Sequence, residues 1–549
     1  MPPGDNSTDG ITRRLYLASL GIGGATAIAG CSGISGEEQA SGNETEGDET
    51  ETSQQLSGHL RFGLYAPPLG INPITGSIIE GYVVQKWMYS TLTMRDSNLN
   101  VHSDLATDWE ASDDSTQWTF MLRDDARFNY NGNRVLAEDV KATFDTVYDE
   151  DVGSPGNGAL GPIESVEVVN DHAVQINLES SYGNMPIKMA KPWAMIAPKE
   201  ILDSDGPQAL DNTDYGSGPF NLKNYIPEDE IVVTANEDYY LTDENGDALP
   251  GVQQVTGQVI EDPTTRINNM RNGSSDIITG VPPENWSQLE NMSEVRTNTV
   301  PGGTFYSIAM RVTDEPFTDN RVRQAFKYAV DKEEILATAQ QGLGVLGQDH
   351  QLAPFYNVAP DLPQKYGPGA QPERARELLA EAGYGDGLTL DFPLIVSPTS
   401  PQMEKTAVLA QEHLSEVGVE FEIRRVSWDQ MWSGIFGNNP FSIMSWFCRP
   451  EPDFLMNQHN TPGAPWAGET MFHPDEFVET LRAAQSALDP ETKKARYREC
   501  AEIMQDRGGY IVPFFASRLH AAQNYVKNFQ PDPLALRERV EPVRLSNDV

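Results

Sequence analysis

Positive charge is what this chain lacks most. Lys and Arg together number 39 against 81 Asp and Glu, which gives a formal net charge of -42 over 549 residues. The acidic excess is spread along the whole chain and would repel phosphates, so we expect no nucleic-acid partner. A solvated acidic surface suits concentrated salt, where screening removes the self-repulsion. We therefore interpret the chain as a halophilic protein.

Cysteine and histidine are also scarce. The three Cys and eight scattered His form no CxxC, no HExxH and no close His pair, so we expect no dedicated metal site. Cys448 and Cys500 are far apart in the sequence, which leaves open whether they form a disulfide or stay as buried thiols. No Gly-x-Ser-x-Gly elbow or pair of catalytic carboxylates is identifiable, so no catalysis is expected. A secreted hydrolase remains the alternative from another class.

The apolar run at 15–30 is too short for a membrane span, which needs roughly 20 residues. It is rich in Gly and Ala, follows Arg13 and Arg14, and ends in IAGC at Cys31. That ending resembles a lipobox. Residues 1–31 are therefore predicted to be a twin-arginine signal, with a covalent lipid on Cys31 as the only attached group. The alternative is a single membrane-spanning anchor.

Residues 32–57 are rich in Gly, Ser, Glu, Thr and Asp and hold almost no apolar side chains. This composition is typical of a flexible, charged tether that lets a folded part stand off the membrane. The folded part is expected to begin near Gly58. At this length, and with 9% aromatic residues, it can form two or three lobes around a large core.

Apolar periodicity predicts alternating strands and helices after Gly58. Expected strands are 59–65, 117–123, 173–178, 305–311, 388–395, 420–426 and 510–515, and expected helices are 80–91, 137–148, 320–331, 372–382, 402–417 and 489–506. Phe144 and Tyr148 are expected in a core, and Gly383 is expected to cap a helix. The strand–helix–strand order over 388–426 predicts an α/β lobe whose sheet is covered by helices.

Short motifs in a fixed order point to one family. They are LATDW at 105–109, WTFMLR at 118–123, NGNRVLAEDV at 131–140, IAPK at 196–199, GSGPF at 216–220, PFTDNRVRQA at 316–325, LAP at 352–354 and ARELL at 375–379. Over roughly 58–529 the chain thereby resembles the large extracytoplasmic solute-binding proteins of ABC transporters, the peptide/nickel type called family 5.

The resemblance implies an α/β, two-lobe periplasmic-binding-protein-like fold of the large type II form. Lobe I would be 58–304 with an extra subdomain at about 90–210, lobe II 305–515, and 516–549 a return to lobe I. A two-strand hinge is expected near 305–311 and 511–515. The lobes would close on a solute and exclude water.

The resemblance also implies partners and a location. We expect a monomer at the outer face of the cell membrane, held there only by its lipid, which delivers a solute to an ABC permease and its ATPase subunits. The solute is expected to be peptide-like or another organic molecule. An oligosaccharide and a nickel or other chelate are the alternatives within the family.

The stretch 442–458, SIMSWFCRPEPDFLMNQ, is the most informative for the solute. In the family's peptide binders an aspartate in this loop holds the peptide ammonium, whereas here Arg449 occupies that region. A guanidinium fork suits a carboxylate or phosphate, which favours a solute bearing a carboxylate or many hydroxyls. The alternative is an internal ion pair of Arg449 with Glu451 or Asp453.

Aromatic side chains complete the predicted solute contacts. Trp446 and Phe447 lie in the same loop as Arg449, and Trp446 is able to stack on a ring, a peptide plane or a cation. The further candidates are Trp428, Tyr65 at the end of the first strand and Tyr306 on a hinge strand. Core packing is the alternative for Trp446, support of the lobe for Trp428, and lining of the hinge for Tyr306.

Overall fold

The computed structural model describes residues 58–68, 70–76, 79–534 and 538–546. The predicted signal with Arg13, Arg14 and Cys31, and the predicted tether at 32–57, lie outside these residues. Within the described ranges, no helix is both long and apolar enough to cross a membrane.

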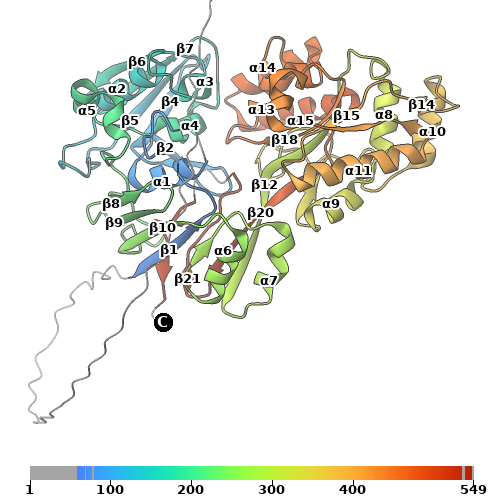
Figure 1. Ribbon diagram of the computed structural model, residues 1–549. Coiled ribbons are helices and arrows are strands. Elements are labelled where there is room, and N and C mark those ends of the chain that lie inside the picture. Colours follow the sequence, from blue (N-terminus) through green and yellow to red (C-terminus); the bar gives the residue numbers. More distant parts are fainter. Residues whose placement is uncertain (1–57, 69, 77–78, 535–537, 547–549) are drawn as a thin grey trace, which may run out of the picture. The chain divides into compact units, whose positions relative to one another are not determined.

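A twelve-stranded mixed sheet runs through the described part of the chain (Figure 1). Its strand order is β17 (Ile423–Arg425), β15 (Leu394–Val396), β18 (Phe441–Phe447), β12 (Val295–Met310), β20 (Phe514–Gln523), β11 (Ile277–Ile278), β1 (His59–Leu64), β10 (Gln254–Val259), β9 (Glu230–Ala235) and β8 (Phe220–Ile226). In addition, β13 (Gly344–Leu346) pairs with β20, and β19 (Tyr510–Ile511) pairs with β12.

β12 belongs to both halves of this sheet. Its first part pairs with β20, and after a register shift between Val300 and Thr304 its last part pairs with β18. The shift contains Gly302, where an added Cβ would lie 2.2 Å from the carbonyl oxygen of Ala516. The backbones approach so closely here that only glycine fits.

Helices cover both faces of the half formed by β17, β15 and β18. On one face a core containing Tyr306, Phe326 and Leu414 is closed by α8 (Asn320–Ala329), α9 (Lys332–Gln340), α10 (Pro372–Glu381) and α11 (Pro401–Glu416). On the other face a core containing Phe305 and Trp446 is closed by α13 (Phe454–Asn460), α14 (Asp475–Ser486) and α15 (Pro490–Arg507). The two sides of β12 therefore face two separate cores.

A four-stranded antiparallel sheet forms a subdomain with a core of its own. Its strand order is β4 (Ala106–Ala111), β5 (Gln117–Leu122), β7 (Ala173–Leu178) and β6 (Ile163–Asn170). Phe144 of α2 (Ala137–Tyr148) is buried in that core, Tyr148 packs against it, and α5 (Lys199–Asp205) lies beside α2 (Figure 1). Both aromatic residues are thus in or against the core, as the sequence predicts.

Shorter elements complete the described fold. They are α1 (Ile79–Met88), β2 (Thr93–Arg95), β3 (Val101–Ser103), α3 (Gly156–Ala159), α4 (Met185–Lys188), α6 (Pro263–Arg271), α7 (Trp286–Glu290), β14 (Leu388–Thr389), β16 (Val419–Glu420), α12 (Trp428–Gln430), β21 (Val526–Lys527) and β22 (Arg544–Leu545).

The predicted mixture of strands and helices is confirmed, with corrections at several ends. The helix expected at 80–91 ends at Met88, whose carbonyl accepts a hydrogen bond from the Gly218 backbone. The strand expected at 388–395 is two strands, because Pro393 lacks the N–H that a continuous ladder needs. Pro513 divides 510–515 in the same way.

The strand expected at 420–426 is also divided, because each piece pairs with a different partner. β16 pairs in parallel with β14, and β17 pairs in parallel with β15. α11 lies between the paired strands in sequence, so the predicted strand–helix–strand arrangement is confirmed. The predicted domain boundaries at 304 and 515 stay predictions.

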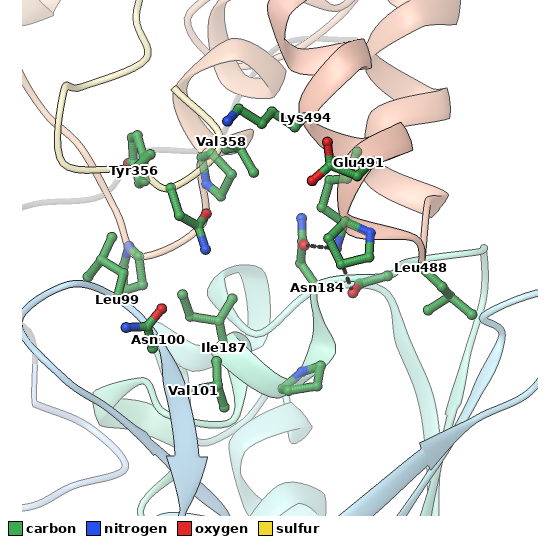
Figure 2. Close-up of a pocket in the computed structure, with 17 residues that line it drawn as sticks. Leu99, Asn100, Val101, Asn184, Ile187, Tyr356, Val358, Leu488, Glu491 and Lys494 are labelled. Atoms are coloured by element: carbon green, nitrogen blue, oxygen red, sulfur yellow. Dashed lines mark hydrogen bonds between the residues drawn. The ribbon is translucent and has the colours of Figure 1, made fainter. Parts of the chain in front are cut away.

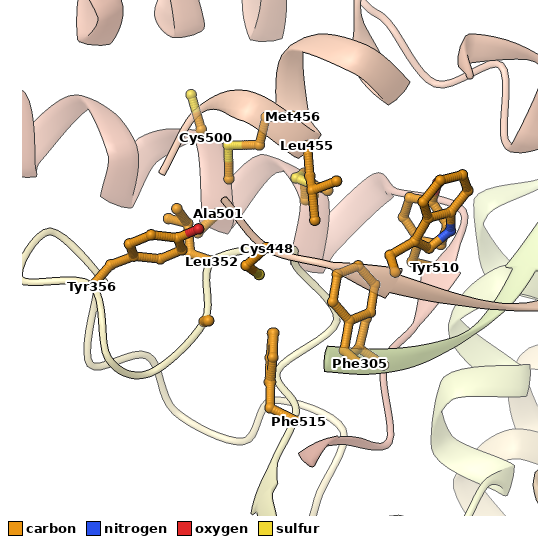
Figure 3. Close-up of a cluster of buried hydrophobic side chains, with 14 of the residues drawn as sticks. Phe305, Leu352, Tyr356, Cys448, Leu455, Met456, Cys500, Ala501, Tyr510 and Phe515 are labelled. Atoms are coloured by element: carbon orange, nitrogen blue, oxygen red, sulfur yellow. The ribbon is translucent and has the colours of Figure 1, made fainter. Parts of the chain in front are cut away.

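Cys448 and Cys500 are both free and buried in the same core (Figure 3). Burial raises the pKa of the Cys448 thiol to about 12, which keeps it protonated and unreactive. Of the two outcomes that the sequence leaves open, the structure has the buried thiols.

We expect Gly302→Ala to destabilise the fold by about 1–3 kcal/mol, because the added methyl forces the backbones of β12 and β20 apart. Urea unfolding of the purified protein measures this. Gly158→Ala is the matched control, since nothing lies within 4 Å of an added Cβ there. Equal midpoints for the two variants would contradict the account of close approach.

Candidate functional site

β18 and the loop after it carry most of the predicted solute contacts. In the antiparallel pair of β18 and β12, Trp446 lies opposite Phe305, so both rings face the same core (Figure 3 shows Phe305). Trp446 is only 6% exposed. Its side chain is therefore packed as a core residue in this structure, and its contact with solute stays a prediction.

Trp446 is the centre of an aromatic cluster, which we define as Trp432, Phe436, Trp446, His459 and Trp466. Ring centroids lie 4.3 Å from Trp446 for His459, 4.7 Å for Trp466, 5.9 Å for Phe436 and 6.2 Å for Trp432. Trp432 is 40% exposed, so the cluster extends from the core to the surface. Ring pairs at such distances are worth about 0.5–1.5 kcal/mol beyond the area they bury.

A buried carboxylate fixes the orientation of the Trp446 indole. Trp446 Nε1 donates to Glu469 Oε1 over 3.2 Å, and the Tyr510 hydroxyl donates to Oε2 over 2.8 Å. His459 Nε2 lies 3.3 Å from the same carboxylate. Because Glu469 Oε1 accepts from the indole N–H inside the core, rotation of the indole would remove a hydrogen bond from a buried carboxylate.

A buried ion triad joins the loop after β18 to the four-stranded subdomain. Lys188 and Lys191 place their ammonium groups 2.9 and 2.8 Å from one oxygen of Glu451, whose side chain is fully buried. Burial alone would raise the pKa of Glu451, but the two ammonium groups lower it to about 2. Glu451 is therefore ionised at neutral pH and holds two segments that are distant in sequence.

Asp453 forms a second set of polar contacts nearby; we call this set and the ion triad the two polar joints. Its carboxylate accepts hydrogen bonds from Tyr182 at 3.3 Å, Asn184 at 3.2 Å, Tyr497 at 3.2 Å and Gln485 at 2.9 Å. Two donors come from the subdomain side and two from α14 and α15. Like Glu451, this acid is committed to contacts within the protein.

Arg449 is partly buried and pairs with neither of these acids. Its Nη1 donates to the Phe447 carbonyl over 3.2 Å, and its guanidinium lies 5.4 Å from the centre of the Phe454 ring. Among the described residues it forms no ion pair. The internal ion pair with Glu451 or Asp453 is therefore wrong, because lysines, hydroxyls and amides occupy those carboxylates. Solute contact by Arg449 stays a prediction.

Two predicted contacts, Trp428 and Phe447, lie at the surface. Their side chains are 38% and 40% exposed. Trp428 packs edge to face on Trp432 with centroids 5.7 Å apart, and Phe447 is the residue whose carbonyl Arg449 binds. The structure thus brings Trp428 and Trp446 against the same ring, Trp432. The Phe447 side chain, next to Trp446 on β18, points to the opposite face of the sheet.

Tyr306 and Tyr65 have other surroundings. Tyr306 is the neighbour of Phe305 on β12, so its ring points to the opposite face, into the core closed by α8 to α11, 5.2 Å from Phe514. The Tyr65 ring lies on Gly280, where an added Cβ would come within 2.6 Å of it. Whether either tyrosine touches solute stays a prediction.

A cavity of about 530 Å³ lies beside the two polar joints. Pro450, Pro452 and Asn184 are among the residues that line it, together with Ile187, Val358 and Lys494 (Figure 2). None of the predicted solute contacts lines this cavity. Across the described residues, no group of three or more His, Cys, Asp or Glu side chains is arranged to hold a metal ion.

Sequence reasoning missed Lys188 and Lys191 entirely. The available signal was weak: two lysines three residues apart, next to Trp193, in a chain where positive charge is scarce. Lys191 and Glu451 are separated by 260 positions, and no local pattern predicts a pairing over that distance.

Comparison with known proteins adds the family context. The family model described as bacterial extracellular solute-binding proteins, family 5 Middle, matches residues 100–465. The oligopeptide-binding protein AppA of Bacillus subtilis is 23% identical over 501 residues, which covers 87% of this chain and 90% of that protein.

Solved structures of similar fold cover most of the chain. HbpA2 from Haemophilus parasuis has a TM-score of 0.78 at 23% identity, covering 89% of this chain and 100% of the other. NikA from Brucella suis, in complex with Fe(III)-EDTA, has a TM-score of 0.77 at 22% identity with the same coverage. The predicted α/β, two-lobe binding-protein fold is confirmed by this likeness.

Acidification tests the ion triad. The folded-state pKa of Glu451 is depressed from 4.5 to about 2, so its stabilisation is present above pH 4.5 and is lost as the pH falls toward 2. Glu451→Gln should destabilise the protein by about 3–5 kcal/mol at pH 6, since it leaves two buried ammonium groups unpaired. It should also reduce the loss of stability between pH 6 and pH 3.

Urea midpoints at the two pH values measure both effects. Glu479→Gln, at an exposed position on α14, is the matched control and should keep the wild-type difference between pH 6 and pH 3. If Glu451→Gln loses as much stability on acidification as the wild type, the triad does not account for this part of the pH dependence.

Proposed function

Because this chain belongs to the extracellular solute-binding proteins of family 5, we propose that it is the lipid-anchored solute receptor of an ABC importer. The observation that carries the proposal is the family match, which extends over both the subdomain and the loop after β18. In this role the protein binds an organic solute outside the cell and presents it to a permease served by ATPase subunits. It catalyses no reaction.

The proposed anchoring rests on the amino-terminal sequence. Arg13 and Arg14 precede an apolar run that ends at Cys31, and an acidic tether at 32–57 follows. A lipid on Cys31 would hold the binding part at the outer face of the membrane while the tether leaves it room to move. The acidic composition adds solubility in concentrated salt.

The proposed binding step is closure of the two halves over the solute. Contacts already present in the structure, among them Lys191 to Glu451 at 2.8 Å and Lys493 to the Asn184 side chain at 2.6 Å, fix where the two halves would meet. They link the subdomain to the loop after β18 and to α15. A solute stabilises the closed form only through contacts that the open form lacks, so these joints set the position at which its contacts must form.

The relatives of this chain bind solutes of several chemical classes. As their names state, the oligopeptide-binding protein AppA of Bacillus subtilis binds oligopeptides, and the glutathione-binding protein GsiB of Salmonella typhimurium, 25% identical over 471 residues, binds glutathione. NikA from Brucella suis was solved with Fe(III)-EDTA. We propose a peptide-like or other organic solute for this chain.

Solute-dependent stabilisation tests the receptor function. We expect the unfolding midpoint of the purified protein to rise when a bound solute is present, by the equivalent of about 2.7 kcal/mol at a hundredfold excess over the dissociation constant. The measurement is a thermal-shift screen of peptides, oligosaccharides and metal chelates at a fixed, high salt concentration. A screen in which no member and no cell extract raises the midpoint would contradict the proposal.

Cys31→Ser tests the anchor. The wild-type protein should sediment with membranes and move into the detergent phase, while the variant should appear soluble in the medium, because the thiol that carries the lipid is missing. Replacing Arg13 and Arg14 by Lys should instead retain the protein inside the cell. Unchanged membrane association of Cys31→Ser would exclude lipid attachment at that position.

A further inference from the structure

Three asparagines at the ends of α6 and α7 stand in the same three-residue pattern. The patterns are NGS at 272–274, NWS at 285–287 and NMS at 291–293. Two further copies, NST at 6–8 and NET at 43–45, lie outside the described residues. Asn-x-Ser/Thr without proline in the middle is the acceptor pattern for N-linked oligosaccharides in proteins outside the cell. A pattern this short also arises by chance, so its surroundings decide whether it can be used.

Access in the folded protein is the first requirement. The proposed twin-arginine route delivers a chain that is already folded, so a transferase outside the cell meets the finished surface. The acceptor asparagine must therefore be exposed. Its loop must also enter an enzyme's active site without unpacking a core, because only weakly held segments open at low cost.

Asn272 meets both requirements. It is exposed and is the first residue after α6. Its Oδ1 accepts a hydrogen bond from the Ser274 backbone N–H over 3.0 Å, and its Nδ2 donates no hydrogen bond within the described residues. Gly273 between them has a φ of 71°, with open space around the position of an added Cβ. The turn thus holds the carboxamide oxygen against the backbone and leaves the amide nitrogen available.

Asn285 fails the second requirement. It is half-buried and caps the start of α7, and its backbone N–H donates to the Pro282 carbonyl over 3.0 Å. The middle residue of the pattern, Trp286, is 5% exposed and packs in a core with Ile267 and Leu289. Drawing this segment into an active site would pull the indole out of that core.

Asn291 lies between these two cases. It is exposed at the end of α7, but its Nδ2 donates to the Ser287 carbonyl over 2.6 Å. The Ser293 carbonyl accepts from the Asn524 side chain over 2.8 Å. Both hydrogen bonds hold the loop in place, and the first uses one of the two protons of the amide nitrogen that would react.

A polar hollow of about 810 Å³ adjoins Asn272. It is lined by the end of α6, the segment after α7 and the turn between β20 and β21 (Figure 1). Asn291, Asn524 and Lys527 are among the lining residues, and their side chains offer donors and acceptors to sugar hydroxyls. None of the predicted solute contacts lines this hollow.

We propose that Asn272 carries an N-linked oligosaccharide, with lower occupancy at Asn291 and none at Asn285. The proposal rests on the proposed receptor function, which places the folded part outside the cell. The co-reactant is a lipid-phosphate-linked oligosaccharide. The Asn272 nitrogen forms a bond to its anomeric carbon, the bond from that carbon to the phosphate oxygen breaks with its electron pair left on the phosphate, and one amide proton is released to the medium.

Mass spectrometry of glycopeptides tests the proposal on the full chain purified from membranes of its source organism. Cleavage after Glu284 and Glu290 by a glutamyl endoprotease puts the three asparagines in different peptides. The sugar should lie mainly on the Asn272 peptide, to a smaller share on the Asn291 peptide and not on the Asn285 peptide. Conversion of Asn272 to aspartate without any sugar would mean simple deamidation beside glycine and would overturn the proposal.

Ser274→Ala removes the hydroxyl that the pattern requires and keeps Asn272, so it should abolish the sugar on that peptide. Ser274→Thr restores a hydroxyl and should retain the sugar. Ser287→Ala is the matched control, because it destroys the pattern at Asn285 and should leave the glycopeptides unchanged. Both serines are exposed, so each variant should still unfold cooperatively, which separates a lost acceptor from a lost fold.

The proposal and the receptor function fail in different ways. If the protein lies at the outer face of the membrane and its Asn272 peptide bears no sugar, the receptor function stands and the proposal is wrong. Sugar on Asn285 in place of Asn272 would equally refute it. If the protein is recovered unmodified from the cytosol, the receptor function fails and the proposal fails with it.

Discussion

The fully buried Glu451, with an ammonium on either side of one oxygen, is the contact on which the arrangement of the candidate site depends. Removing three charges from water is unfavourable, and such a group is stable only when all partners are present. The triad therefore holds the subdomain and the loop after β18 together only while all three side chains are present. It fixes the short loop between Cys448 and Asp453, and with it the position of the Arg449 backbone.

On the other side of the same loop, packing rather than charge sets the geometry. The Trp446 indole is bonded to Glu469 and packed against the rings of His459 and Trp466, so β18 ends in a rigid platform. A rigid strand end followed by a loop fixed by ion pairs holds the backbone on both sides of Arg449. A backbone that is already ordered loses less entropy when a solute binds.

Local periodicity was sufficient to predict much of the fold. The helix at 137–148 and the strand at 173–178 match the structure to the residue, because each carries a complete amphipathic pattern. The strand at 388–395 was predicted too long, since its apolar pattern continues across the interruption at Pro393. Strand ends of this kind are decided by pairing partners, which are distant in sequence.

The candidate site was predictable only in part, for a related reason. Its loop was identified through the family resemblance, and contact of Arg449, Trp446 and Phe447 with a solute there stays a prediction. Alternation along β12 separates Phe305 from Tyr306, but the sequence does not reveal which of the two faces lies beside the loop. The partners of Glu451 depend on how the subdomain meets the loop, and that is a property of the tertiary structure.

The unpaired thiols of Cys448 and Cys500 have a consequence for how the protein is made. Both lie deep in one core, and the described fold closes without a covalent cross-link between them. Its maturation therefore needs no oxidant or disulfide isomerase and can be completed in the reducing cytosol. Twin-arginine export, which Arg13 and Arg14 predict for this chain, requires that the protein is folded before it leaves the cytosol.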